Sequence, residues 1–123
     1  AMTDISGFGL ASHLGDICES SNLSAEIYLS DKILINKKLK LLNSYRSTGF
    51  ENNYIAAYEI LKMKKNHSLI DILFDPQTNG PLLMAINEKE KEFFEKSFYK
   101  SYKFAPIFLG KLTKKREKLI FIN

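Results

Sequence analysis

Two short polar segments carry the residues of this chain whose types and spacing could do chemistry. The first, residues 3–10, reads Thr-Asp-Ile-Ser-Gly-Phe-Gly-Leu, and the second, residues 73–83, reads Leu-Phe-Asp-Pro-Gln-Thr-Asn-Gly-Pro-Leu-Leu. Both are glycine-bearing turns beside apolar residues, and such turns let the backbone approach a phosphate group or a metal ion closely. The two segments therefore predict a site for a phosphorylated ligand or a cation.

Asp4 is the residue of the first segment with a clear chemical use. It lies just before a predicted helix start, where unpaired N–H groups attract anions, and its carboxylate is a ligand that Mg²⁺ accepts. Gly7 and Gly9 weaken the first helical turn, which indicates that something needs close access to the backbone. The alternative is that Asp4 only caps the helix and complements its dipole.

The second segment is a longer turn than its flanks require. Asp75-Pro76 favours a turn, and Asn79-Gly80 permits left-handed backbone conformations. Seven residues separate two apolar pairs, and six of them are the polar or turn-forming residues 75–80. We interpret this excess as a weak sign of a site, with a plain connection as the alternative.

The other reactive residue types are scarce. The histidines are His13 and His67, so no cluster exists, and we interpret His13 as a packing residue of the first helix rather than a ligand. The single cysteine, Cys18, excludes an intrachain disulfide and is expected to be a buried, inert thiol. No CxxC, HExxH or Walker pattern is present.

Composition describes an ordinary globular domain. The 123 residues are 45% hydrophobic and 26% charged, which suits one domain with a real core. No apolar run is long enough to cross a bilayer and no leader is visible, so we expect a cytoplasmic protein with no membrane partner. The net charge of +4 comes partly from lysine runs without interleaved aromatics, so we read a solvated face and expect no nucleic-acid partner.

Apolar periodicity predicts the elements of the first half. A helix is expected from the first segment to residues 20–22, with Ser6 as N-cap, and a strand over 25–29. A second helix is expected from Asn36 to Gly49. The remaining expectations are a third helix that Asn52 or Asn53 caps, carrying Tyr54, Ala57, Tyr58 and Leu61 inward, and a surface loop over 62–66.

The second half predicts more strand than helix. Residues 68–74 are ambiguous between helix and strand, and the apolar run 82–86 is typical of a central strand. Asn87 and Glu90 resemble a capping box that opens a helix with Phe94, Phe98 and Tyr102 on one face. Strands are expected over 105–112 and 118–122, the last antiparallel to its predecessor. The fold class is therefore α/β (mixed α+β), a single mixed sheet with packed helices.

Together, the two segments resemble the C-terminal half of selenophosphate synthetases (selenide, water dikinases). The first family motif typically reads T-D-V-T-G-F-G-L with a following G-H, which here is residues 3–10 followed by Ser12-His13. The second typically reads D-P-Q-T-S-G-G-L-L, which here is residues 75–83. A glycine and an asparagine between the motifs match Gly49 and Asn52 or Asn53. The two motifs jointly are specific, and the resemblance covers essentially the whole chain.

The resemblance implies a fold, a reaction and a set of site residues. The fold is the C-terminal domain of the aminoimidazole ribonucleotide synthetase superfamily. The reaction converts ATP, selenide and water to selenophosphate, AMP and phosphate, with Mg²⁺. Asp4 matches the family's metal-holding aspartate. No residue of this chain matches a catalytic one, and the residues that match the ligand-binding motifs are Thr3, Ser6, Gly7, Phe8, Gly9, Asp75, Gln77, Thr78, Asn79 and Gly80.

The chain also departs from the family. Ser6 replaces a threonine and keeps the hydroxyl, whereas Asn79 and Pro81 replace serine and glycine, and a proline removes a backbone donor. The family's N-terminal half, with its catalytic Cys or selenocysteine, has no counterpart here, and Cys18 does not match it. We therefore expect residues 1–123 to be a single C-terminal domain, inactive alone and binding neither ATP nor Mg²⁺ by itself. Its partner would be the missing N-terminal domain, with a homodimer in the full-length protein and a monomer or weak dimer for this part.

Two other hypotheses remain open. One is a non-catalytic, stand-alone relative that binds a partner or a small anion, which the changes at Asn79 and Pro81 favour. The other is a different enzyme of the same superfamily, acting on a phosphorylated purine precursor or on a thiamine or hydrogenase-maturation substrate. The sequence Asp-Pro-Gln-Thr at 75–78 argues against the latter.

Overall fold

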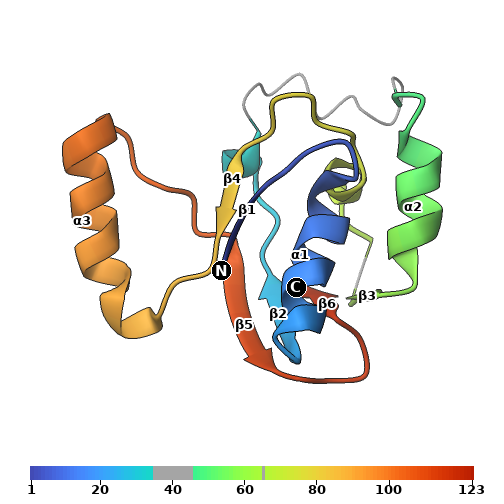
Figure 1. Ribbon diagram of the computed structural model, residues 1–123. Coiled ribbons are helices and arrows are strands. Elements are labelled where there is room, and N and C mark those ends of the chain that lie inside the picture. Colours follow the sequence, from blue (N-terminus) through green and yellow to red (C-terminus); the bar gives the residue numbers. More distant parts are fainter. Residues whose placement is uncertain (35–45, 65) are drawn as a thin grey trace.

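A computed structural model describes residues 1–34, 46–64 and 66–123 of the chain. Its strands are short and its longest helices, α1 and α3, have 12 residues each. Figure 1 shows how the elements are arranged. In chain order they are β1 (Met2–Asp4), α1 (Gly9–Ser20), β2 (Leu23–Ile27), η1 (Asp31–Ile33), α2 (Phe50–Tyr58), β3 (Leu61–Met63), η3 (Ile70–Leu73), β4 (Leu82–Met84), η4 (Glu88–Glu90), α3 (Lys91–Tyr102), β5 (Gly110–Lys114) and β6 (Ile120–Ile122), where η marks a 3₁₀ helix.

Four of the described strands form a mixed sheet in the order β3-β6-β2-β5. β6 runs parallel to β2 and β3, and β5 runs antiparallel to β2. The terminal strand β6 therefore runs antiparallel to its predecessor β5, as expected, but the two do not pair, because β2 lies between them. Ser24 of β2 secures this crossing: its hydroxyl donates to the carbonyl of Lys118 at 2.8 Å and accepts the Arg116 N–H at 2.9 Å.

The remaining described strands, β1 and β4, form a separate antiparallel pair in which Thr3 lies opposite Leu83. Residues 82–86 were expected to form a central strand of a single sheet, and that expectation was wrong. Leu82 is 52% exposed, and β4 pairs with β1 rather than with the four-stranded sheet. Its apolar run predicted burial, but a local pattern does not record which strand becomes the partner.

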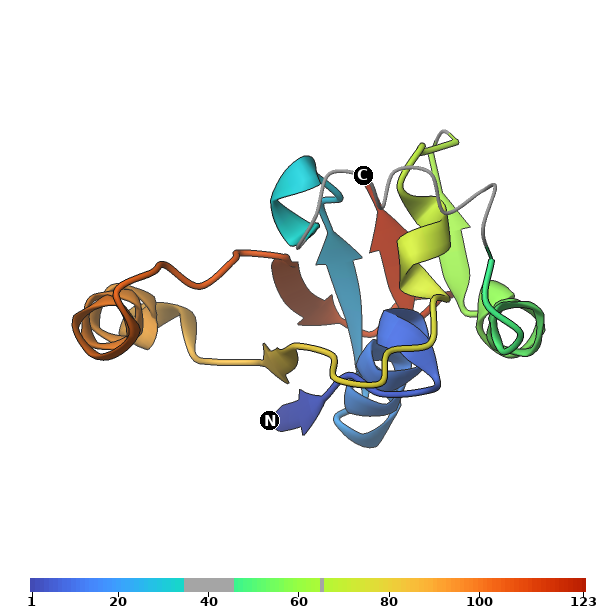
Figure 2. The same ribbon diagram turned by 90° about the horizontal axis from the view of Figure 1, so that it is seen from above.

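The core lies between the four-stranded sheet and α1, which covers one face of that sheet (Figure 2). Leu14 and Cys18 of α1 are buried against Ala25, Ile27 and Ile120. The apolar residues at helical spacing on α1 therefore pack with the alternating apolar residues of the strands. The expectation of a buried Cys18 is confirmed, and burial raises the pKa of its thiol.

Two helix starts differ from the expectation. Phe8, not Ser6, occupies the N-cap of α1 and makes no side-chain cap bond. Gly49 is the N-cap of α2 rather than the end of a preceding helix, and the predicted cap residues Asn52 and Asn53 lie inside α2. Residues 36–45 of the helix predicted from Asn36 to Gly49 lie outside the described residues, and residues 46–48 are not helical. The predicted end of α1, by contrast, is confirmed at Ser20.

Several shorter elements also differ from the expectation. Part of the predicted loop 62–66 belongs to the edge strand β3, with Lys62 exposed. The ambiguous segment 68–74 forms the 3₁₀ helix η3. The strand expected over 105–112 begins only at Gly110. Asn87 acts as a cap, its side-chain oxygen accepting the N–H of Lys89 at 3.0 Å, but it caps η4, which leads into α3.

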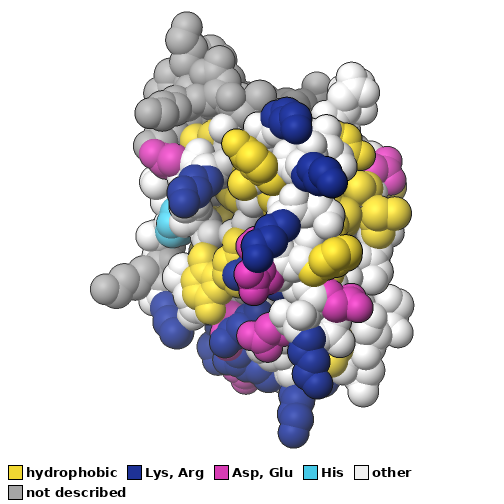
Figure 3. Space-filling view, turned by 90° about the vertical axis from the view of Figure 1, so that its left-hand side faces the viewer, with side chains coloured by type: hydrophobic (Ala, Val, Ile, Leu, Met, Phe, Trp, Pro, Cys, Tyr) yellow, Lys and Arg dark blue, Asp and Glu magenta, His cyan; other side chains and the backbone are white. Residues whose placement is uncertain are grey.

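α3 stands beside the rest of the molecule and has no buried residue (Figures 1 and 2). The predicted stripe is confirmed: the Phe94 and Phe98 rings are 5.7 Å apart, and those of Phe98 and Tyr102 are 4.6 Å apart. The outward surface on this side mixes hydrophobic with positive and negative side chains (Figure 3). Within the described ranges, no helix is long and apolar enough to cross a membrane.

Candidate functional site

The fold brings the two polar segments together. The N–H of Ile5 donates to the carbonyl of Pro81 at 2.9 Å, and the N–H of Gln77 donates to the carbonyl of Ser6 at 3.1 Å. These bonds extend the pairing of β1 with β4 into the loops that follow β1 and precede β4. Residues 5–9, here called loop 1, and residues 74–80, here called loop 2, therefore lie side by side.

The contact between the loops requires glycine at two positions. A Cβ atom at Gly80 would lie 2.1 Å from the carbonyl oxygen of Ile5, far inside contact distance. Gly9 has φ of +77°, and a Cβ there would lie 2.9 Å from the carbonyl oxygen of Leu73. L-residues with side chains rarely adopt such a φ. These two glycines of the sequence motifs are thus required for the close approach of the loops.

Asn53 of α2 hydrogen-bonds to both loops. Its side-chain nitrogen donates to the carbonyls of Gly7 at 2.8 Å and of Phe74 at 3.0 Å, one in each loop. The residue is only 7% exposed. Our sequence interpretation offered Asn52 or Asn53 as a helix cap and missed this role. A polar amide on the inward face of a helix was the one signal that could have revealed it.

His13 holds loop 1 from the first helical turns of α1. Its Nε2 atom accepts the backbone N–H of Ser6 at 3.1 Å and lies 3.0 Å from the Ser6 hydroxyl oxygen. An acceptor Nε2 means that the neutral ring carries its proton on Nδ1. His13 is therefore a satisfied hydrogen-bonding residue of the fold, in line with the packing interpretation.

Asp75 turns its carboxylate into its own loop. The Oδ2 atom accepts the side-chain N–H of Gln77 at 2.6 Å. Partial burial raises the pKa of the Asp75 carboxyl, and hydrogen bonds from Gln77 and Ser47 oppose that effect. Asp75 and Gln77 therefore hydrogen-bond to each other and stabilise the conformation of loop 2.

The other predicted residues form an accessible rim. Asp4 is exposed at the end of β1 opposite Leu82, so the alternative that it caps a helix was wrong. Thr3 is half-buried in the same strand, with its hydroxyl 3.2 Å from the carbonyl of Asp4. The remaining exposed members of the predicted set are Gly7, Phe8, Thr78 and Asn79.

A complete metal site is absent from the described ranges, which contain no group of three or more His, Cys, Asp or Glu residues placed to hold an ion. Asp4 could supply one carboxylate ligand. Mg²⁺ takes six ligands in near-octahedral geometry, so further oxygen donors would be needed. The described residues alone do not fit this ion.

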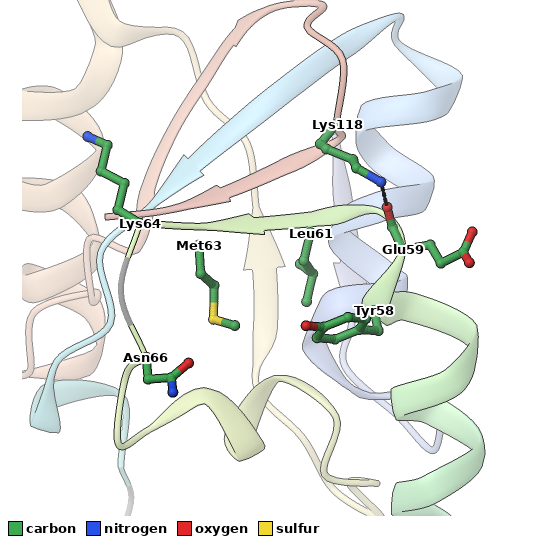
Figure 4. Close-up of a pocket in the computed structure, with 7 residues that line it drawn as sticks. All are labelled: Tyr58, Glu59, Leu61, Met63, Lys64, Asn66 and Lys118. Carbon is green, nitrogen blue, oxygen red and sulfur yellow. Dashed lines mark hydrogen bonds between the residues drawn. The ribbon is translucent and has the colours of Figure 1, made fainter.

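A separate open pocket of about 740 Å³ lies away from the two loops. Figure 4 shows its side chains around β3, with Lys118 donating to the carbonyl of Glu59. None of the residues that line it belongs to either loop, so the pocket is distinct from the candidate site. Its lining residues are Tyr58, Glu59, Leu61, Met63, Lys64, Asn66 and Lys118.

With this geometry known, comparison with known proteins assigns the family. Residues 1–121 match the family described as AIR synthase related protein, C-terminal domain. The chain belongs to this family. The match confirms the resemblance drawn from the motifs and the expected mixed fold class. The matched residues include β1, both loops and strands of both sheets.

Curated relatives of the domain are named selenide, water dikinase. The protein from Caldanaerobacter subterraneus subsp. tengcongensis is 30% identical over 126 residues, covering 100% of this chain and 36% of that protein. The protein from Shewanella sp. (strain MR-4) is 35% identical over 114 residues, covering 91% of this chain and 32% of that protein. The domain spans about a third of the length of these relatives.

Proposed function

We propose that this domain is the C-terminal part of a selenide, water dikinase, which makes selenophosphate, AMP and phosphate from ATP, selenide and water. In this proposal, the domain supplies part of the nucleotide and metal site and is inactive alone. The other part comes from an N-terminal domain of the same protein. The name of the relatives and the juxtaposition of loops 1 and 2 support it.

The observation that carries the proposal is the backbone contact between the loops. Ser6 and Gln77 are far apart in sequence, yet the carbonyl of one accepts the N–H of the other at 3.1 Å. A plain connection would not need two such loops, each with a required glycine, to meet. The exposed residues of the two loops offer polar side chains and backbone groups to a ligand.

Within this site we assign Asp4 the metal contact. Mg²⁺, when bound, would neutralise charge on the phosphates of ATP and orient them. The chain's own residues then have simpler tasks. The N–H groups of Gly7 and Phe8 in loop 1 would donate to phosphate oxygens, and Thr78 and Asn79 would offer polar side chains from loop 2.

The change at Pro81 is compatible with this function. Proline lacks an N–H, but the pairing with β1 uses only the Pro81 carbonyl, which accepts the N–H of Ile5. The change at Asn79 keeps a polar, exposed side chain. Neither departure disturbs the contact between the loops.

The test is an activity assay of the polypeptide that the source cells make from this gene. We expect a product longer than this chain that converts ATP to AMP only when selenide is present. Asp4→Asn in that protein should reduce the rate by at least about 100-fold, because a lost charge contact at the metal is worth several kcal/mol. Asp16→Asn, an exposed change on α1, is the matched control.

The competing function is that of a stand-alone domain that binds a partner or a small anion. The lack of a complete metal site in the described ranges is the observation that favours it. A native product of only 123 residues, or a longer one without selenide-dependent AMP formation, would reject our proposal and favour this alternative.

A further inference from the structure

Two carbonyl oxygens, one from each loop, face one side-chain nitrogen. The Gly7 and Phe74 carbonyls both accept from Nδ2 of Asn53, at 2.8 and 3.0 Å. Carbonyl oxygens have no hydrogen to share with each other, so bringing them together requires a donor between them. A primary amide nitrogen carries two N–H groups, one for each oxygen. The residue type at position 53 is therefore matched to this geometry.

The amide is held on a firmly anchored helix. Asn53 lies in the first turns of α2, where its own N–H donates to the carbonyl of Gly49 at 3.2 Å. Phe50 is only 2% exposed, and its ring packs edge-on against that of Phe74 at 5.9 Å. The helix that carries the amide thus contacts the same residue whose carbonyl the amide binds. A shift of α2 would move both contacts together.

Two backbone bonds also link the segments. The Gln77 N–H donates to the Ser6 carbonyl, and the Ile5 N–H donates to the carbonyl of Pro81, just after loop 2. Asn53 adds a side-chain connection whose bond to Phe74 is buried, and there an unpaired carbonyl would lack water as a substitute partner. Backbone bonds align the loops, and the amide fixes how closely the Gly7 and Phe74 carbonyls approach.

We propose that Asn53 is a positioning residue of the site, which fixes the separation of loops 1 and 2 by donating to both. It touches no ligand and acts through the backbone of Gly7 and Phe74. Its effect on catalysis rests on the function proposed above, whereas its effect on the loops does not. The first test therefore uses this chain and needs no activity.

The test compares amide hydrogen exchange in Asn53→Ala with exchange in the unsubstituted chain. Alanine keeps the helix and removes both donors. We expect the N–H groups of Ile5 and Gln77 to exchange at least about tenfold faster, as the loss of ordinary hydrogen bonds predicts. The sheet N–H groups of Ala25 and Ile120 should keep their rates within about threefold.

The matched control is Asn52→Ala. Asn52 is the neighbouring, exposed asparagine of α2, and its substitution should leave all four rates unchanged. Equal acceleration of loop and sheet amides in Asn53→Ala would mean that the residue only stabilises the fold. Unchanged loop rates would mean that the amide does not join the loops. Either result overturns the proposal.

A second variant covers the case in which Asn53→Ala does not fold. Asn53→Gln keeps both donors on a side chain one methylene longer. A primary amide therefore stays near the two carbonyls, but its N–H groups are displaced. We expect faster exchange confined to the two loops, smaller than in Asn53→Ala. Unchanged loop exchange in Asn53→Gln would count against the proposal.

The functional readout belongs to the longer, active protein. There, Asn53→Ala should lower kcat about 10- to 100-fold and change KM for ATP by less than about threefold, since a small misplacement of reacting groups affects the chemical step most. Asn53→Gln should recover part of kcat. Inactivity of the unsubstituted protein would refute the proposed function, whereas unchanged kcat in an active protein would refute the positioning role.

Discussion

Gly80 lies where loop 2 crosses loop 1 at Ile5, and the crossing leaves no room for a side chain. The obstacle is a backbone carbonyl, that of Ile5, which cannot swing away as a side chain could. Gly7 is the natural comparison, because a Cβ there would meet nothing within 4 Å. Both glycines belong to the motifs, but only one is required by the local geometry.

We therefore predict that Gly80→Ala lowers the free energy of unfolding by about 2–3 kcal/mol, while Gly7→Ala changes it by less than about 0.5 kcal/mol. Urea unfolding with a common slope measures both. An equal loss in the two variants would show that the glycines matter for chain flexibility and not for the crossing.

Asp75 gives a prediction about pH. Because burial raises the pKa of its carboxyl in the folded protein, the folded state binds the proton more tightly than the unfolded state. The stability that this provides is present below the unfolded pKa, near 3.9, and is lost as pH rises through the folded value. Asp75→Asn removes the titration and keeps an oxygen that can accept from Gln77.

The unfolding free energy of Asp75→Asn relative to the unsubstituted chain should therefore move in favour of the variant between about pH 4 and pH 7. Urea titrations at several pH values measure this difference. If this difference in unfolding free energy stays constant with pH, the pKa of Asp75 is not raised by folding. If the difference instead moves against the variant as pH rises, folding lowers that pKa.

At the scale of elements, α2 and α3 differ in how they are held. α2 buries Phe50 and Asn53 against the two loops. α3 buries nothing, and its aromatic side chains contact one another and Phe104, whose ring lies 5.3 Å from that of Phe98. A helix without tertiary burial has little stability beyond its own propensity and pairwise contacts.

Phe98→Ala should therefore unfold α3 locally and leave the four-stranded sheet intact. We expect rapid amide exchange throughout α3, with less than about 0.5 kcal/mol lost from global unfolding. Phe50→Ala, on a buried ring of α2, should cost about 3–5 kcal/mol globally. Comparable global losses would mean that α3 unfolds together with the core.

At the scale of the whole molecule, the described surface carries exposed aromatic residues mainly along α3 and the segment after it. Phe93 is 76% exposed, and hydrophobic and charged side chains alternate over the outward surface on this side (Figure 3). Charges interspersed in this way limit tight association through a continuous apolar patch.

We accordingly predict that the 123-residue chain is a monomer or a weak dimer at micromolar concentration. Size-exclusion chromatography with light scattering measures this directly. A tight dimer would contradict the prediction, and loss of that dimer in Phe93→Glu would assign the contact to α3.

The sequence by itself determined the local features. Helical spacing predicted α1 and the aromatic face of α3, a single apolar cysteine in a helix predicted the buried Cys18, and two glycine-bearing motifs predicted the family. These features depend on neighbours within a few residues, so periodicity and turn chemistry capture them.

Only the tertiary structure decided which strands pair and what Asn53 does. β6 pairs with β2 and β3, and not with β5, because the turn before it crosses the end of β2 at Ser24. Asn53 finds its partners in two loops that are distant along the chain. Strand pairs and buried amides depend on groups that folding brings together from separate segments, and no local pattern records which groups those are.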